Sequence, residues 1–255
     1  MRQARTETIR LAVIGDFQTG KSSLVNCLLG SERAWTGDGF RPETEEVAEY
    51  DFSPFLHIVD TPGFDDVRPG MEKTTIEAIH QSDAILFLKT ERVLTDHDKG
   101  ILGHAEHKAL IVLFNCLGKD VRKRANPDLA DNHNTCRLIE KELDNERLSD
   151  RLLPVAGHCV WPVNLLWAQY GLGLPLADEQ VNDVESFIGC TLHMEGNDST
   201  VRAEMLRRSG VLEVRDCLVD LPVRRLRDAI GHRVKTLNRI CDQFAAELGK
   251  RWGIA

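Results

Sequence analysis

The 255-residue sequence lacks long apolar runs, paired cysteine motifs, internal repeats and low-complexity tracts. Its longest apolar segments, such as Ala109–Phe114, are far too short to span a bilayer. The seven cysteines include no C-x-x-C pair. This argues against a disulfide framework or a zinc site and favours reduced thiols in a cytoplasmic protein. The apolar segment at residues 9–14 runs straight into a glycine-rich loop, so a cleavable signal peptide is not expected.

Charge is distributed unevenly along the chain. Residues 201–255 carry 12 Lys and Arg against 7 Asp and Glu, whereas residues 1–200 carry 20 against 33. An acidic surface repels a nucleic-acid backbone, so no nucleic-acid partner is expected. The basic C-terminal part could face an acidic partner, an anionic membrane or the acidic part of the same chain.

The glycine-rich loop at residues 15–22 has the spacing G-x-x-x-x-G-K-S. A largely apolar segment precedes it and a helical pattern follows, as a phosphate-binding P-loop requires. In such a loop, backbone N–H groups and a helix N-terminus face phosphate oxygens. Lys21 would supply a charge to the β- and γ-phosphates, and Ser22 would offer a hydroxyl to Mg²⁺. The predicted nucleotide-binding residues of this loop are Gly15, Asp16, Phe17, Gln18, Thr19, Gly20, Lys21, Ser22 and Ser23.

A second motif, Asp-Thr-Pro-Gly at residues 60–63, follows an apolar segment 38 residues after Ser22. Pro-Gly turns are common, so the motif is weak alone and gains its meaning from its place after a strand and a P-loop. The Asp60 carboxylate would hold Mg²⁺ through a water molecule, and the Gly63 backbone N–H would approach the γ-phosphate.

Strands and helices are predicted to alternate from residue 9 to about residue 170, which indicates an α/β fold with a doubly wound, mostly parallel sheet. The segments 47–52 and 56–60 are predicted to form an antiparallel pair at one edge. Further strands are predicted at residues 84–88, 109–115 and 152–157. Helices are predicted at residues 24–29, 71–81, 95–104, 136–147 and 162–170. Loops at the carboxyl ends of the strands should hold the ligand.

Residues 15–30, which read GDFQTGKSSLVNCLLG, resemble the first motif of P-loop GTPases of the translation-factor-related class. They are most similar to bacterial dynamin-like and Era- or septin-like G domains. Residues 60–63 resemble the third motif, and residues 41–44 resemble switch I, which implies that Thr44 binds Mg²⁺ and reports the γ-phosphate. The resemblance covers about residues 9–170. It implies GTP and GDP as ligands, Mg²⁺ as cofactor, and hydrolysis of GTP to GDP and phosphate.

The guanine-reading motif departs from the usual N-K-x-D of this family. Asn115 stands where the motif should begin, but Cys116 replaces the lysine and Gly118 falls where the aspartate is due. Lys119 and Asp120 follow two residues later. One interpretation is a lengthened loop, with Asp120 reading guanine and Lys119 lying over the P-loop. The other is that Asp120 does not reach the base, so that discrimination against adenine is weak.

The residue after the third motif is Phe64, where many small GTPases have a glutamine that orients the attacking water. Dynamin-like, Era-like and septin-like proteins share an apolar residue here. The resemblance therefore implies slow intrinsic hydrolysis, which dimerisation through the nucleotide face or a partner would raise. The predicted catalytic residues are Lys21, Thr44, Gly63 and Gln18, although Gln18 is equally well explained as a solvated loop residue.

Three parts are expected in the chain: a G domain over residues 1–170, an insertion or linker with short helices over residues 171–210, and a C-terminal amphipathic helical segment over residues 211–255. The last part carries an apolar stripe at helical spacing. The stripe is formed by Val223, Leu226, Ile230, Val234, Leu237, Cys241, Phe244 and Leu248. It could pack on the G domain, bind a helical partner through residues 211–248, or lie on a membrane surface.

Two other functions remain open at this stage. The altered base motif and the missing glutamine suit a nucleotide-binding regulatory module with little or no hydrolysis. The second is a role as a component of a membrane-associated dynamin-like assembly. However, the roughly 85 residues after the G domain are too few for a full stalk and lipid-binding tip. Membrane contact is therefore expected to be peripheral at most. An Era-like role in ribosome assembly is disfavoured because no RNA-binding domain or basic groove is recognisable.

Overall fold

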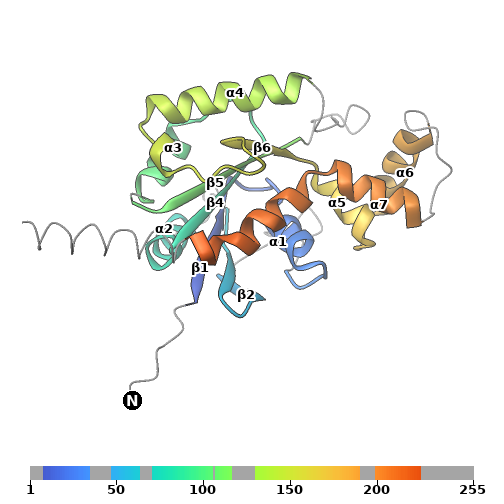
Figure 1. Cartoon of the computed structure of the whole chain (residues 1–255), viewed down its shortest axis with the longest axis horizontal. Coiled ribbons are helices and arrows are strands. Elements are labelled where there is room, and N and C mark those ends of the chain that lie inside the picture. Colours follow the sequence, from blue (N-terminus) through green and yellow to red (C-terminus); the bar gives the residue numbers. More distant parts are fainter. Residues whose placement is uncertain are drawn as a thin grey trace, which may run out of the picture. The chain divides into compact units, whose positions relative to one another are not determined.

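The computed structural model describes residues 8–34, 47–63, 71–105, 107–116, 130–189 and 199–224. It confirms the predicted α/β fold (Figure 1). The strands are β1 (Ile9–Ile14), β2 (Ala48–Ser53), β3 (Leu56–Asp60), β4 (Ala84–Lys89), β5 (Ala109–Asn115) and β6 (Val160–Val163). The helices are α1 (Lys21–Leu29), α2 (Met71–Gln81), α3 (Asp96–Gly103), α4 (Ala130–Asn145), the short 3₁₀ helix η2 (Ser149–Arg151), α5 (Leu165–Leu172), α6 (Asp178–Phe187) and α7 (Ser199–Arg208).

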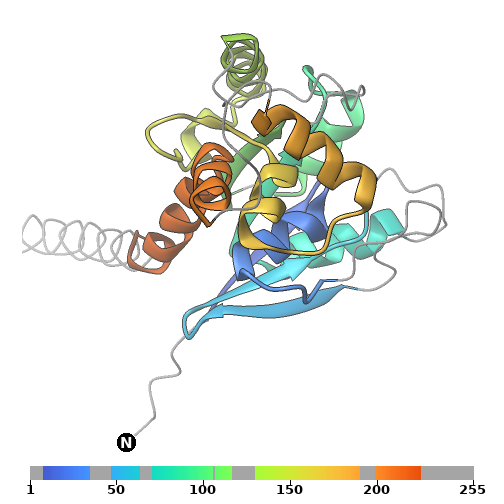
Figure 2. The same ribbon diagram turned by 90° about the vertical axis from the view of Figure 1, so that its right-hand side faces the viewer.

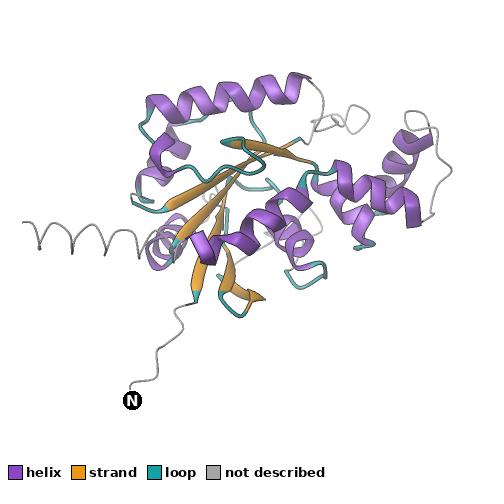
Figure 3. Cartoon of the chain, in the orientation of Figure 1, coloured by secondary structure: helices purple, strands orange, loops and turns teal. Residues whose placement is uncertain are grey.

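The six strands form one sheet in the order β2-β3-β1-β4-β5-β6 (Figure 3). Every neighbouring pair is parallel except β2 and β3, which form the predicted antiparallel edge pair. β1 lies between β3 and β4, and Val13 near its end is in register with Asp60 and with Leu86. The carboxyl ends of three strands therefore meet where β1 enters the P-loop.

Helices cover both faces of this sheet (Figure 1). α2, α3 and α4 share a buried apolar cluster with the strands, to which Ala12 and Ile14 of β1 contribute. Because side chains alternate along a strand, Leu11 and Val13 point to the other face, where α1 contacts β1 and β3. The inner strands β4 and β5 are buried on both sides, which explains their nearly continuous apolar sequences.

The predicted strand at residues 152–157 is wrong, because the sixth strand of the sheet lies later, at β6. Ala156 and Gly157 have φ angles of 47° and 86°, and Val155 pairs with His158 across them. This tight turn ends the extended segment before it can continue along β5. The chain then doubles back and enters the sheet at Val160.

At the N-termini of two helices, a side chain that accepts a hydrogen bond from the first turn fixes the residue at which the helix begins. α3 begins after Thr95 as predicted, since the Thr95 hydroxyl accepts from the Asp98 N–H and the Asp98 carboxylate accepts from the Thr95 N–H. The helix predicted from Pro162 begins later, because Pro162 belongs to β6. Asn164 caps α5 by accepting a hydrogen bond from the Trp167 N–H at 3.1 Å.

The short helices predicted between residues 171 and 210 are α6 and α7, and both pack against α5 (Figure 2). Their shared apolar cluster consists of Leu166, Trp167, Tyr170, Val184, Ile188, Val201 and Met205. The chain divides into two compact units, residues 1–217 and residues 218–255. The expected boundaries at residues 170 and 210 stay predictions.

Residues 211–224 are helical, in line with the predicted C-terminal helical segment. Most of the predicted apolar stripe, from Leu226 onward, lies outside the described residues. Among the helices that the structure describes, none has the length and apolarity needed to cross a membrane.

The described cysteines form no disulfide, and they differ strongly in burial. Burial raises the pKa of the Cys27 and Cys136 thiols to about 12, whereas Cys159 is exposed. Since the thiolate is the reactive form, we expect iodoacetamide to label Cys159 in the folded protein and to label Cys27 and Cys136 only after denaturation. Peptide mass spectrometry of timed reactions checks this. Early labelling of Cys27 would contradict the buried placement.

Candidate functional site

The P-loop joins β1 to α1 at the carboxyl edge of the sheet. Gly15 packs so closely that an added Cβ would collide with the Leu88 carbonyl oxygen of β4 and lie 2.9 Å from the Thr19 hydroxyl. Gly20 has a φ of 94°, a left-handed conformation that glycine adopts without strain. The Thr19 hydroxyl donates to the Asp16 carbonyl at 3.0 Å. The loop is therefore held in shape by its own atoms and by β4.

Lys21, the first residue of α1, is folded back over the loop. Its side chain is buried, and its Nζ donates to the carbonyl oxygens of Gly15 at 3.1 Å and Asp16 at 2.8 Å. These neutral carbonyls are weaker partners for an ammonium group than phosphate oxygens, which carry charge. An incoming phosphate group would therefore replace these carbonyl oxygens as the hydrogen-bond partner of the Lys21 ammonium group.

Ser22 and Asp60 meet at the base of the P-loop. The Ser22 hydroxyl donates to Asp60 Oδ2 at 2.8 Å, and both side chains are buried. The contact follows from the parallel pairing of β1 with β3, and the Thr61 hydroxyl strengthens that pairing by donating to the Val13 carbonyl at 2.8 Å. A hydroxyl and a carboxylate are hard oxygen donors, which suit Mg²⁺. The donor set therefore fits the predicted magnesium site.

Gly63 packs directly on the P-loop. A Cβ at this position would lie 2.8 Å from Phe17 Cα and 2.9 Å from Phe17 N, so the contact requires glycine. The second motif and the P-loop are consequently in van der Waals contact. Phe17 is 39% exposed, and Gln18, which has a φ of 58°, is also exposed. In this structure the Gln18 side chain therefore faces solvent.

Asn115 ties the end of β5 to the same loop. It is fully buried, and its Nδ2 donates to the Thr19 carbonyl at 3.0 Å. Its Oδ1 has no hydrogen-bond partner among the described residues. The start of the predicted base-reading segment is thus fixed beside the P-loop. The other predicted site residues, Thr44, Lys119 and Asp120, lie outside the described residues, as does Phe64.

A buried ion network under the P-loop was missed at the sequence level. Lys89, the last residue of β4, is fully buried, and its Nζ lies 2.6 Å from Asp98 Oδ2 and 3.2 Å from Asp16 Oδ2. Burial alone would lower the pKa of the Lys89 ammonium group, but its hydrogen bonds to and the charges of Asp98 and Asp16 outweigh burial and raise it. The lysine is charged at neutral pH, and its stabilising effect is lost only as the pH rises through its raised pKa.

Two signals in the sequence could have revealed this network. Lys89 directly follows the apolar segment 84–88, and a lysine at the end of a buried strand indicates a charge that needs a partner. The spacing Thr95-x-x-Asp98 is that of a capping box and places a carboxylate at the start of a helix. The parallel pairing of β1 with β4 then brings Lys89 close to Asp16, which lies 73 residues earlier in the chain.

The family comparison agrees with this geometry. Residues 10–116 match the model of the 50S ribosome-binding GTPase family. These residues are therefore similar to a P-loop GTPase domain. The matched segment contains the P-loop, the Ser22–Asp60 contact, Lys89 and Asn115. The described residues of the predicted phosphate-binding site therefore lie within the matched segment.

Curated relatives show the same domain in longer proteins. The tRNA modification GTPase MnmE of Wolinella succinogenes is 35% identical over 125 residues, which are 45% of this chain and 27% of that protein. GTPase Der of Clostridium perfringens is 35% identical over 122 residues, which are 43% of this chain and 28% of that protein. The chain thus spans about a third or less of the length of these relatives.

Two solved structures show limited similarity to this chain. A variant of Aquifex aeolicus Era bound to GDP and AlF4⁻ is 19% identical, with a TM-score of 0.46. The match covers 68% of this chain and 58% of the Era chain. A member of an oligomerised bacterial dynamin pair is 16% identical, with a TM-score of 0.43. The match covers 97% of this chain and 46% of the dynamin chain.

Proposed function

We propose that this chain hydrolyses Mg²⁺-bound GTP to GDP and phosphate and acts as a nucleotide-dependent conformational switch in the cytoplasm. The observation that carries the proposal is the buried 2.8 Å hydrogen bond between Ser22 and Asp60. This hydrogen bond joins the P-loop to the Asp-Thr-Pro-Gly turn, next to the charged side chain of Lys21. The match of residues 10–116 to a GTPase family supports guanine nucleotides as the ligands.

In the proposed reaction, water attacks the γ-phosphorus, and the bond from that phosphorus to the β–γ bridging oxygen breaks. Negative charge develops on the bridging oxygen and the phosphate oxygens, and Lys21 stabilises it. Ser22, Asp60 through a water molecule, and Thr44 would hold Mg²⁺. When bound, Mg²⁺ neutralises charge on the β- and γ-phosphates. Loss of the γ-phosphate would then relax the loops at residues 31–46 and 61–72.

The Gly63–Phe17 contact supports a role for Gly63 as γ-phosphate sensor. We expect Gly63→Ala to slow GTP hydrolysis by about 10- to 100-fold, because the new methyl group would push the turn away from the P-loop and misplace its N–H. GDP affinity should change much less, since GDP lacks the γ-phosphate. Phosphate-release kinetics and fluorescent GDP binding measure the two effects. Equal losses in both would contradict the sensor role.

Guanine selectivity is proposed to come from Asp120, with Asn115 fixing the start of its loop and Lys119 lying over the P-loop. The test is competition of labelled GTP by unlabelled GTP and by ATP, in the natural protein and in Asp120→Ala. ATP should compete poorly with the natural protein and better with the variant. Equal competition by both nucleotides in the natural protein would contradict the assignment.

Activation by dimerisation through the nucleotide face is the finer proposal. The P-loop presents Phe17 and Gln18 to solvent, and Phe64 offers no amide to orient water. The hydrolysis rate per molecule should therefore rise with protein concentration. A rate independent of concentration would instead point to activation by another partner.

A nucleotide-binding module with little turnover is the competing function, and the same Phe64 favours it. Single-turnover hydrolysis with excess protein separates the two functions, because it needs no product release. Complete conversion of bound GTP within minutes to hours supports the GTPase. Persistence of intact GTP at every protein concentration supports the module.

A further inference from the structure

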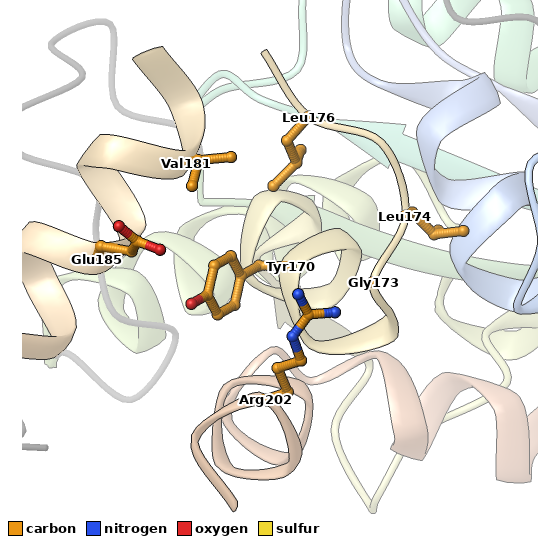
Figure 4. A pocket seen from close by; sticks show the side chains of 7 residues that line it. All are labelled: Tyr170, Gly173, Leu174, Leu176, Val181, Glu185 and Arg202. Atoms are coloured by element: carbon orange, nitrogen blue, oxygen red, sulfur yellow. The ribbon is translucent and has the colours of Figure 1, made fainter. Parts of the chain in front are cut away.

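A cavity that is partly open to solvent lies beside α5, α6 and α7, apart from the residues that form the P-loop site (Figure 4). Its volume is 130 Å³. This is slightly less than the cavity of about 150 Å³ that holds a benzene molecule in an engineered protein core, so a ligand of roughly six to nine heavy atoms fits. Its lining consists of Tyr170, Gly173, Leu174, Leu176, Val181, Glu185 and Arg202.

Tyr170 supplies the first sign that the cavity holds a polar ligand. The residue is 4% exposed, and its hydroxyl is buried with no hydrogen-bond partner in the part of the chain that the structure describes. Buried hydroxyl groups are paired in most proteins, because leaving one unpaired is costly. Figure 4 shows the Tyr170 ring between Glu185 and Arg202. A ligand between these groups could give the hydroxyl its missing partner.

Arg202 is built into the wall from α7. Its guanidinium carbon lies 5.6 Å from the centre of the Tyr170 ring. Gly173 ends α5 with a φ of 68°, and a Cβ there would lie 2.6 Å from an Arg202 guanidinium nitrogen. Glycine thus leaves room for the guanidinium at the carboxyl end of α5, where a positive charge is also favoured.

The remaining walls define the chemistry of the occupant. Glu185 brings a carboxylate from α6, whereas Leu176 and Val181 form an aliphatic side (Figure 4). A guanidinium suits a carboxylate, a carboxylate suits an ammonium group, and the aliphatic side suits a short hydrocarbon chain. A single small molecule that carries all three groups is an α-amino acid with an aliphatic side chain.

We propose that this cavity binds a small aliphatic α-amino acid. Its carboxylate pairs with Arg202, its ammonium group with Glu185, and its side chain lies against Leu176 and Val181. The Tyr170 hydroxyl donates to the ligand carboxylate. This binding does not depend on the proposed hydrolysis of GTP, because none of the lining residues belongs to the P-loop site.

The test uses the full chain and isothermal titration calorimetry with L-valine, isobutylamine and isovalerate. L-valine should bind, and each analogue lacking one charged group should bind at least tenfold more weakly. Tyr170→Phe and Glu185→Gln should each weaken L-valine binding by tenfold or more. Glu179→Gln, on the exposed surface of the same helix, is the matched control and should leave binding unchanged.

Thermal unfolding separates loss of the site from loss of the fold. Tyr170→Phe removes only a hydroxyl that has no partner among the described residues, so its melting temperature without ligand should match that of the natural protein. The stabilisation by L-valine should be reduced. Absence of L-valine binding would overturn the proposal. Equal binding of an analogue, or unchanged binding by both Tyr170→Phe and Glu185→Gln, would overturn it as well.

Discussion

Lys21→Met is expected to reduce kcat/KM for GTP by about 100-fold or more. Removal of one group that stabilises developing charge typically costs two to three orders of magnitude in rate. The proposed reaction assigns this role to Lys21, whose buried ammonium group now donates to two P-loop carbonyl oxygens at 3.1 and 2.8 Å and would donate to the phosphates instead. Phosphate-release kinetics with saturating Mg²⁺ measure the loss. Methionine keeps the length of the side chain and removes the charge.

The matched control for this variant is Lys141→Met, an exposed lysine on α4. Its hydrolysis should equal that of the natural protein. The melting temperature of Lys21→Met should be recorded as well, since a folded but inactive variant is the expected result. Hydrolysis by Lys21→Met within a factor of three of the natural rate would contradict the assigned site and the proposed reaction.

Lys89→Met should lower the free energy of unfolding by about 3 to 5 kcal/mol, because breaking a buried ion pair leaves a carboxylate buried without its counter-charge. Here that carboxylate is Asp98, which is fully buried and whose Oδ1 has no partner among the described residues. Urea denaturation followed by circular dichroism measures the change. GTP binding should also weaken, because Asp16 of the P-loop loses a partner at 3.2 Å.

Two further variants separate the buried charge from other effects. Lys99→Met removes a more exposed lysine from α3 that pairs with Glu146, so it should change stability little. The double variant Lys89→Met with Asp98→Asn should be more stable than the sum of the two single losses predicts, because neither charge is then left alone. Strict additivity of the two losses would show that Lys89 and Asp98 do not act as a pair.

The phosphate end of the site was predictable because its parts are local. The P-loop is one continuous motif between a strand and a helix, and Asp60 ends an apolar segment with a distinctive turn. Parallel strands present their carboxyl ends at one edge, so the sequence already implied that Asp60 would approach Ser22. The structure adds the distance, 2.8 Å. The roles assigned to the individual residues stay predictions.

Other features depend on packing that no short pattern encodes. The partners of Lys89 are 73 and 9 residues away in the chain, and only the sheet brings them together. The sixth strand was misplaced because the apolar segment before the turn at Ala156 and Gly157 resembles a strand as closely as β6 does. The cavity beside Tyr170 exists only because three helices meet at particular angles.

The strand order has a consequence for how this protein folds as it is synthesised. β1 is made first, yet it lies in the middle of the sheet, between β3 and β4. Its pairing with β3 must therefore wait until the chain has been made as far as Asp60, and its pairing with β4 until Lys89, and each pairing closes a loop of tens of residues. The P-loop, first in the sequence, is expected to be among the last parts of the sheet edge to take shape. A ribosome-bound chain that ends before β4 should accordingly bind no nucleotide.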